Sequence, residues 1–250
     1  MISEKNVATD FGGFWAEYLP LLTPSFVKVF NEAYSEDLTE IPFSNFYSIP
    51  IGDEVTKHDL VAEFAFCLAE TANNIAIPVE AFRDDEDTIH ESYDKAIGFL
   101  KRYQNESDDM LLTDPEIEES FQIATQYHHF FEYLNNGDVI FRPKVKGAGF
   151  LGVCEGDLSI GDTLYEVKTV SRNLAGKDIK QLLVYFALQH STGDRKWSNG
   201  GFFNPRKSLH YKFSVDHLIY RTSGGRSTTE VFQDIVDFLS YRDIEIDTIF

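Results

Sequence analysis

A short segment that alternates apolar and polar residues around a tight turn constrains the fold of this 250-residue chain more than any other feature. Residues 158–160 and 163–170 alternate, and Gly161-Asp162 between them is typical of a two-residue hairpin loop. In a hairpin with that loop, each residue has a fixed partner on the other strand. The predicted pairs are Ile160–Thr163, Ser159–Leu164, Leu158–Tyr165 and Asp157–Glu166.

The predicted register gives the hairpin one polar and one apolar face. Paired residues point to the same side of a sheet, as do residues two positions apart on one strand. Asp157, Glu166 and Lys168 therefore share a face, with the two carboxylates about 5 Å apart at their Cβ atoms. Two carboxylates beside an ammonium are costly unless a hard divalent cation binds between them, and Mg²⁺ and Mn²⁺ take oxygen ligands of this kind. The opposite, apolar face holds Leu158, Ile160, Tyr165 and Val167.

The pattern of the chain changes near residue 137. Before that point apolar residues recur mainly at helical spacing, and after it short strand-like runs appear. The sequence therefore predicts an α/β protein with a mainly helical, acidic region at 1–114 and a core with a C-terminal helix at 115–250. Predicted helices cover 58–73, 88–103, 115–134, 177–190 and 228–239, and predicted strands cover 139–141, 158–160, 163–170, 201–203 and 217–221.

The net charge of −19 is unevenly distributed along the chain. Residues 1–136 hold 7 Lys and Arg against 27 Asp and Glu, whereas residues 137–226 hold 14 against 8. A basic stretch is what a phosphate backbone requires, so the middle of the chain is compatible with nucleic acid. The acidic front favours a subunit that binds a protein partner over a free-standing enzyme.

The cellular location is predicted from what the sequence lacks. No apolar run reaches the roughly 18 residues of a membrane helix, and the polar N-terminus has no apolar core of a signal peptide. The two cysteines, Cys67 and Cys154, have neither metal-ligand spacing nor a disulfide pattern. We therefore expect a cytoplasmic protein with no membrane partner.

The spacing around the hairpin resembles the signature of a nuclease superfamily. Gly156-Asp157, eight intervening residues and Glu166-Val167-Lys168 are similar to the D…(D/E)xK motif of the PD-(D/E)xK, or restriction-endonuclease-like, nucleases. The resemblance covers roughly residues 115–222 and implies an α-β-β-β-α-β core with a mixed central sheet, which carries the motif on its central hairpin. The order of predicted elements from residue 115 matches that core. The chain departs from the name of the motif in having glycine rather than proline before the aspartate.

The resemblance also implies a role for each residue of the motif. Asp157 and Glu166 would bind Mg²⁺ or Mn²⁺, with the carbonyl of Val167 as a third ligand, and Lys168 would position the attacking water. Gln181, on the helix after the lysine strand, would orient that water or a phosphate. Some members of the family carry a glutamate on the first core helix, and of the candidates Glu118, Glu119 and Glu132 we favour Glu119.

Further basic residues are candidate phosphate contacts. Lys177, Gln181 and Tyr185 are spaced four residues apart, so they share one stripe of the predicted helix, with Lys177 toward its start. A turn signal precedes Arg206 and Lys207, which we expect in a solvated turn, with phosphate contact as the alternative.

Together these observations predict a metal-dependent nuclease that hydrolyses phosphodiester bonds. DNA is favoured over RNA as its substrate, in a setting of restriction, repair or anti-phage defence. Other hypotheses stay open. The polar patch can be a solvated sheet face, or the chain can be a non-cleaving relative that only binds nucleic acid. It can also be a non-catalytic module that binds a basic protein through its acidic helical front. A different metal-dependent phosphoryl enzyme would lack the Gln181 stripe facing the hairpin.

Overall fold

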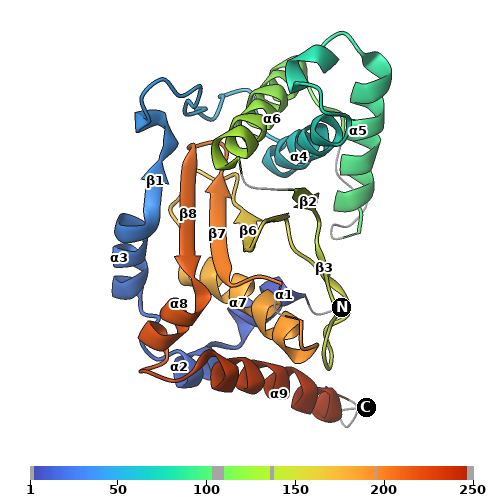
Figure 1. Cartoon of the computed structure of the whole chain (residues 1–250). Coiled ribbons are helices and arrows are strands. Elements are labelled where there is room, and N and C mark those ends of the chain that lie inside the picture. The colour runs from blue at the N-terminus through green and yellow to red at the C-terminus, as the bar shows by residue number, and fades with distance from the viewer. Residues whose placement is uncertain (1–2, 103–109, 136–137, 195, 247–250) are drawn as a thin grey trace.

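A mixed six-stranded sheet forms the centre of this α/β protein (Figure 1). The structure, a computed structural model, describes residues 3–102, 110–135, 138–194 and 196–246. The sheet order is β1-β8-β7-β6-β5-β2, in which β6 and β7 are parallel and the other neighbours are antiparallel. The strands of this sheet are β1 (Ser35–Asp37), β2 (Val139–Phe141), β5 (Leu158–Ile160), β6 (Thr163–Val167), β7 (Asn199–Asn204) and β8 (Leu209–Ser214). A separate two-stranded ribbon consists of β3 (Lys144–Val145) and β4 (Cys154–Glu155).

The helices begin and end where the sequence supplies local signals. Pro115 lies in the first turn of α6, the Glu116 carboxylate accepts the Thr113 N–H (3.0 Å), and Asn135 ends the helix in the left-handed conformation. Among the described residues, no helix is long and apolar enough to cross a membrane. The α-helices are α1 (Glu4–Asp10), α2 (Gly12–Tyr18), α3 (Pro24–Tyr34), α4 (His58–Ile75), α5 (Glu86–Leu100), α6 (Asp114–Leu134), α7 (Gly176–Ser191), α8 (Val215–Thr222) and α9 (Thr228–Ile246). The last residue of the predicted helix 88–103 lies outside the described residues.

The hairpin of β5 and β6 has the predicted register and the predicted division of faces. Leu158, Ile160 and Tyr165 are buried in a hydrophobic cluster with residues of α4 and α6. Leu164 points the other way and is buried with residues of α7. The face that carries Glu166 is therefore the face covered by α7. The observed pairs are Leu158–Tyr165, Ser159–Leu164 and Ile160–Thr163.

Residues before position 115 supply one strand of the sheet and helices that pack against α6 and against α7. Strand β1 pairs with β8, with Ser35 opposite Tyr211. Helix α4 packs against α6, and α1 packs against α7. Val7 is buried in the same cluster as the residues of α7, and its carbonyl accepts the indole N–H of Trp15 (2.7 Å). The acidic, mainly helical front is thus packed directly on the sheet and its helices.

The strand predicted at 217–221 is wrong. These residues lie in α8, because the Ser214 side chain accepts the His217 N–H and starts a helix that buries Leu218, Ile219 and Thr222 on one side. Its place in the sheet is taken by β8, which was not predicted. The remaining elements occur in the predicted order α6, β2, β5, β6, α7, β7, with the β3–β4 ribbon inserted between β2 and β5.

Candidate functional site

The polar face of the hairpin brings Asp157, Glu166 and Lys168 together. Lys168 follows β6, and its Nζ donates to Glu166 Oε1 (2.8 Å). Asp157 precedes β5, and its Oδ2 accepts the backbone N–H of Val167 (2.7 Å). The hydrogen bond to Val167 holds the aspartate beside the end of β6, one step beyond the last ladder pair. The three residues predicted from the motif therefore form one cluster.

Glu166 is the most constrained member of this cluster. Its side chain is almost fully buried (3% exposed), and its Oε2 has no hydrogen-bond partner among the described residues. Burial raises the pKa of Glu166, the charge of Asp157 raises it further, and Lys168 opposes both effects. Burial also raises the pKa of Asp157, against the effect of Lys168. A buried carboxylate oxygen without a partner is costly, so this arrangement favours an additional cation.

The available donors at this cluster are hard oxygen atoms. Asp157 and Glu166 supply carboxylates, and the carbonyl of Val167 remains a predicted ligand. No group of three or more His, Cys, Asp or Glu side chains lies at metal-binding distance in the described parts of the chain. Mg²⁺ usually keeps several waters and binds through one or two carboxylates, so two carboxylates fit such an ion.

Lys168 is held in place from a second side by α7. Its Nζ donates to Gln181 Oε1 (3.1 Å), and the Gln181 amide lies 3.5 Å from the Tyr185 hydroxyl. Tyr185 in turn donates to the carbonyl of Glu155 (3.1 Å). Burial lowers the pKa of Lys168, but Glu166 and Asp157 outweigh this effect and raise it, so the amine stays charged. The Gln181–Tyr185 stripe therefore faces the hairpin, while Lys177, nearer the helix start, is exposed.

The loop between Lys168 and α7 is tied down at both ends. Asp178 accepts the Ala175 N–H (2.7 Å) at the start of α7 and both terminal nitrogens of Arg172 (2.6 and 2.9 Å). At the other end, the Asn204 side chain donates to the carbonyl of Val170 (2.7 Å). These contacts limit the positions that the Lys168 backbone can take.

Glu119 is not part of this cluster. It lies on α6, where it forms a buried ion pair with Arg206 and accepts the N–H of Gly52 (3.4 Å). The solvated turn expected at Arg206 is wrong for that residue, because its side chain is only 4% exposed. Lys207 instead donates to the side chain of Asn173 (3.0 Å). The competing Glu118 pairs with Arg83 at the surface, and Glu132 lies near His128 and His129 on the same helix.

Arg142 supports Asp157 and was not found from the sequence. Its N–H donates to the carbonyl of Asp157 (2.9 Å), and its backbone is left-handed, with φ of 47°. The guanidinium lies over the ring of Phe99 (4.0 Å) and forms an ion pair with Glu63 on α4. No local pattern marks Arg142, because Phe99 and Glu63 lie more than forty residues away in the sequence and Asp157 lies beyond the β3–β4 ribbon.

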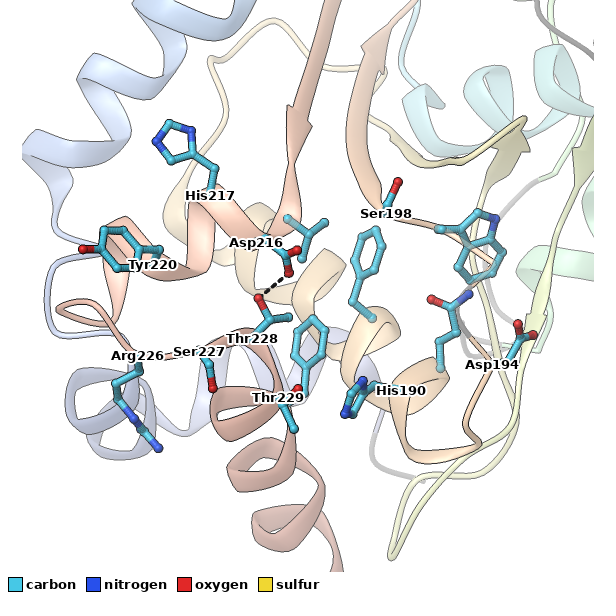
Figure 2. Close-up of a pocket in the computed structure, with 15 residues that line it drawn as sticks. His190, Asp194, Ser198, Asp216, His217, Tyr220, Arg226, Ser227, Thr228 and Thr229 are labelled. Carbon is cyan, nitrogen blue, oxygen red and sulfur yellow. Dashed lines mark hydrogen bonds between the residues drawn. The ribbon is translucent and has the colours of Figure 1, made fainter.

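A pocket of about 710 Å³ lies elsewhere on the protein (Figure 2). It is lined by the end of α7, including His190, by α8, including His217, and by the start of α9, where Thr228 donates to Asp216. Ser198, also in its lining, precedes β7 at the end where Thr163 pairs with Asn199. Glu166 and Lys168 lie at the other end of these strands. The pocket therefore contains none of the predicted site residues.

Comparisons with known proteins leave the chain without a family assignment. No protein-family model matches it, and no curated protein matches its sequence. Any functional assignment therefore depends on the side chains and elements described above.

Proposed function

We propose that this protein is a metal-dependent nuclease whose active site is the cluster of Asp157, Glu166, Lys168 and Gln181. The observation that carries the proposal is the buried Glu166 Oε2, which has no hydrogen-bond partner in the described part of the chain although a second carboxylate and an ammonium lie beside Glu166. The order of α6, β2, β5, β6, α7 and β7, with the motif on the β5–β6 hairpin, is that of a restriction-endonuclease-like core and supports the same proposal.

The chemistry follows from what each side chain can hold. A Mg²⁺ or Mn²⁺ ion bound by Asp157 and Glu166 would polarise a phosphoryl oxygen and acidify a bound water. Lys168, kept charged by the two carboxylates, can donate to a phosphate oxygen or to the attacking water. Gln181 accepts from Lys168 through Oε1, and in this arrangement it orients the lysine. Stabilisation of developing phosphate charge by such a fixed donor is a large contribution to catalysis.

The charge distribution supports a nucleic-acid substrate and a separate protein partner. Four residues of the basic middle of the chain lie at the loop between β6 and α7: Lys168 and Arg172 are in the loop, Lys177 follows it at the start of α7, and Lys207 donates to its Asn173. A phosphate backbone suits such a surface. DNA is the proposed substrate, and the acidic front is the proposed surface for a partner subunit, in a restriction, repair or anti-phage assembly.

The test is cleavage of plasmid and of single-stranded DNA with Mg²⁺ or Mn²⁺, beside a Lys168→Ala variant. We expect metal-dependent cutting that the variant loses by roughly two or more orders of magnitude. Calorimetry with Mn²⁺ separates the remaining outcomes. Absence of both cutting and Mn²⁺ binding would reject the nuclease and favour a non-catalytic interaction module. Binding without cutting would point to a nuclease that requires its partner.

A further inference from the structure

The N-terminal helix α1 lies on the helix that carries Gln181 and Tyr185. Figure 1 shows α1 beside α7, and the two helices pack against each other. Val7 and Ala8 are buried, and the Trp15 indole donates to the carbonyl of Val7 (2.7 Å). Lys180 of α7 lies over the ring of Trp15, with its Nζ 5.6 Å from the ring centre. These contacts fix α1 close to the candidate active site.

Lys5 is the cation that α1 brings to this place. Burial raises the pKa of both Asp157 and Glu166, and the charge of Lys5 is one of the influences that lower it again. The charge of Lys5 therefore acts on both carboxylates, in keeping with the packing of α1 on α7. Lys168 already donates to Glu166 and Gln181. Lys5, by contrast, is exposed, and its Nζ makes no hydrogen bond or ion pair with the residues that the structure describes.

The charges around Lys5 make its position significant. Residues 1–136 contain only seven Lys and Arg against 27 acidic residues, so most of this front repels a polyanion. An exposed lysine on α1, which packs against α7, offsets part of that repulsion near the proposed active site. An ammonium is a point charge suited to phosphate oxygens, and such contacts position nucleic acid without reading its sequence.

We propose that Lys5 binds a backbone phosphate of the DNA substrate next to the scissile phosphate, so that α1 is part of the substrate-binding surface. The inference rests on the proposed nuclease function and adds to it a positioning residue from the front of the chain. Lys5 acts on binding and placement of the substrate, whereas Lys168 acts on the reacting atoms.

The experiment compares the full-length protein with Lys5→Ala, Lys5→Arg and the matched surface control Lys28→Ala, an exposed lysine on α3. Binding of a fluorescent DNA duplex is measured with Ca²⁺ over a series of salt concentrations. Loss of one phosphate contact lowers the slope of log affinity against log salt by about 0.9. We expect that decrease for Lys5→Ala, with affinity weakened several-fold at low salt, and wild-type slopes for Lys5→Arg and Lys28→Ala. A merely structural role would not change the slope.

Cleavage of the same duplex distinguishes failure of this inference from failure of the proposed function. We expect Lys5→Ala to raise KM several-fold with kcat nearly unchanged, and thermal melting to show that the variant is folded. If wild type cuts DNA, Lys168→Ala does not, and Lys5→Ala matches wild type in slope and KM, the role of Lys5 is overturned and the nuclease stands. If wild type does not bind DNA, the role of Lys5 is overturned, and if it also neither cuts DNA nor binds Mn²⁺, the nuclease is overturned as well.

Discussion

Lys168 and Glu166 form a buried ion pair in which Nζ lies 2.8 Å from Oε1, while Oε2 of the same carboxylate has no partner among the described residues. The lysine thus pairs with one oxygen of the carboxylate, and the charge of Asp157 raises the pKa of Glu166. Breaking a buried pair by removing one partner is costly, because it leaves an uncompensated charge. The pair is therefore both a structural constraint and the centre of the proposed chemistry.

Metal binding should depend on pH through Glu166. Burial and Asp157 raise its pKa to about 7 against the effect of Lys168, and a carboxylate must lose its proton to bind a cation. A raised carboxyl pKa stabilises the metal-free protein at low pH, and this contribution is lost as pH rises through that value. We expect Mn²⁺ affinity to increase by up to roughly tenfold per pH unit between about pH 6 and about pH 7. Calorimetry at several pH values checks this, and equal affinity throughout would contradict it.

Glu119 should matter for stability and not for chemistry. Glu119 and Arg206 form an ion pair buried between α6 and the turn after β7. Glu119→Leu leaves Arg206 as a buried, unpaired charge, which costs about 3–5 kcal/mol in unfolding free energy. The double variant Glu119→Leu/Arg206→Met removes both charges and should recover most of that loss. Urea unfolding measures both, and a double variant as unstable as the single one would refute the pairing.

Glu116 should stabilise the fold most at neutral pH. Burial raises its pKa, but N–H donors of Thr113, Thr56 and Lys57 outweigh that effect and lower it to about 2. Stability from a lowered carboxyl pKa is present above the unfolded value and is lost as pH falls toward the folded one. We expect Glu116→Gln to cost about 1.5–3 kcal/mol near pH 7 and progressively less below about pH 4.5.

A surface glutamate on the same helix provides the control for Glu116. Glu118 forms an exposed pair with Arg83, so Glu118→Gln should cost at most about 1 kcal/mol. Chemical unfolding of both variants across the pH range is the measurement. The prediction would be contradicted if both variants lost equal unfolding free energy, or if the loss at Glu116 stayed unchanged in acid. Either result would mean that the buried hydrogen bonds of Glu116 add no more stability than the exposed pair of Glu118.

Substitution of alanine at two glycines should change the stability of the fold in opposite directions. A Cβ at Gly201 in β7 would overlap the ring of Tyr165 on the neighbouring strand, so Gly201→Ala should destabilise by about 1–3 kcal/mol. A Cβ at Gly98 in α5 meets nothing within 4 Å, so Gly98→Ala should stabilise by about 0.5–1 kcal/mol through helix propensity. Thermal melting of the two variants decides, and a stable Gly201→Ala protein would contradict the β6–β7 packing.

The predictable part of the fold is the part set by local patterns. A two-residue loop at Gly161-Asp162 fixes every pair of the hairpin, and the observed ladder has that register. The helix from 177 to 190 was predicted from apolar spacing, and α7 spans Gly176–Ser191. The resemblance to the nuclease core predicts that Gln181 faces the hairpin, and Gln181 does contact Lys168.

The unpredictable part depends on contacts between distant residues. The run at 217–221 is apolar enough for a strand or a helix, and the Ser214 cap decides for the helix. Arg206 resembled a surface turn residue until α6 supplied Glu119 as its partner. Lys5 lies in a polar N-terminal stretch, and only the packing of α1 on α7 brings its helix beside the helix that carries Gln181.

The most direct test of the proposed site compares two buried glutamates in one cleavage assay. Glu166→Gln and Glu119→Gln each neutralise a carboxylate that pairs with a buried cation, but only Glu166 belongs to the proposed active site. With folded protein, plasmid DNA and Mg²⁺, we expect Glu166→Gln to lose roughly two or more orders of magnitude in rate. Glu119→Gln should cut at nearly the wild-type rate per folded molecule. Wild-type cutting that survives in Glu166→Gln would contradict the assignment of the active site.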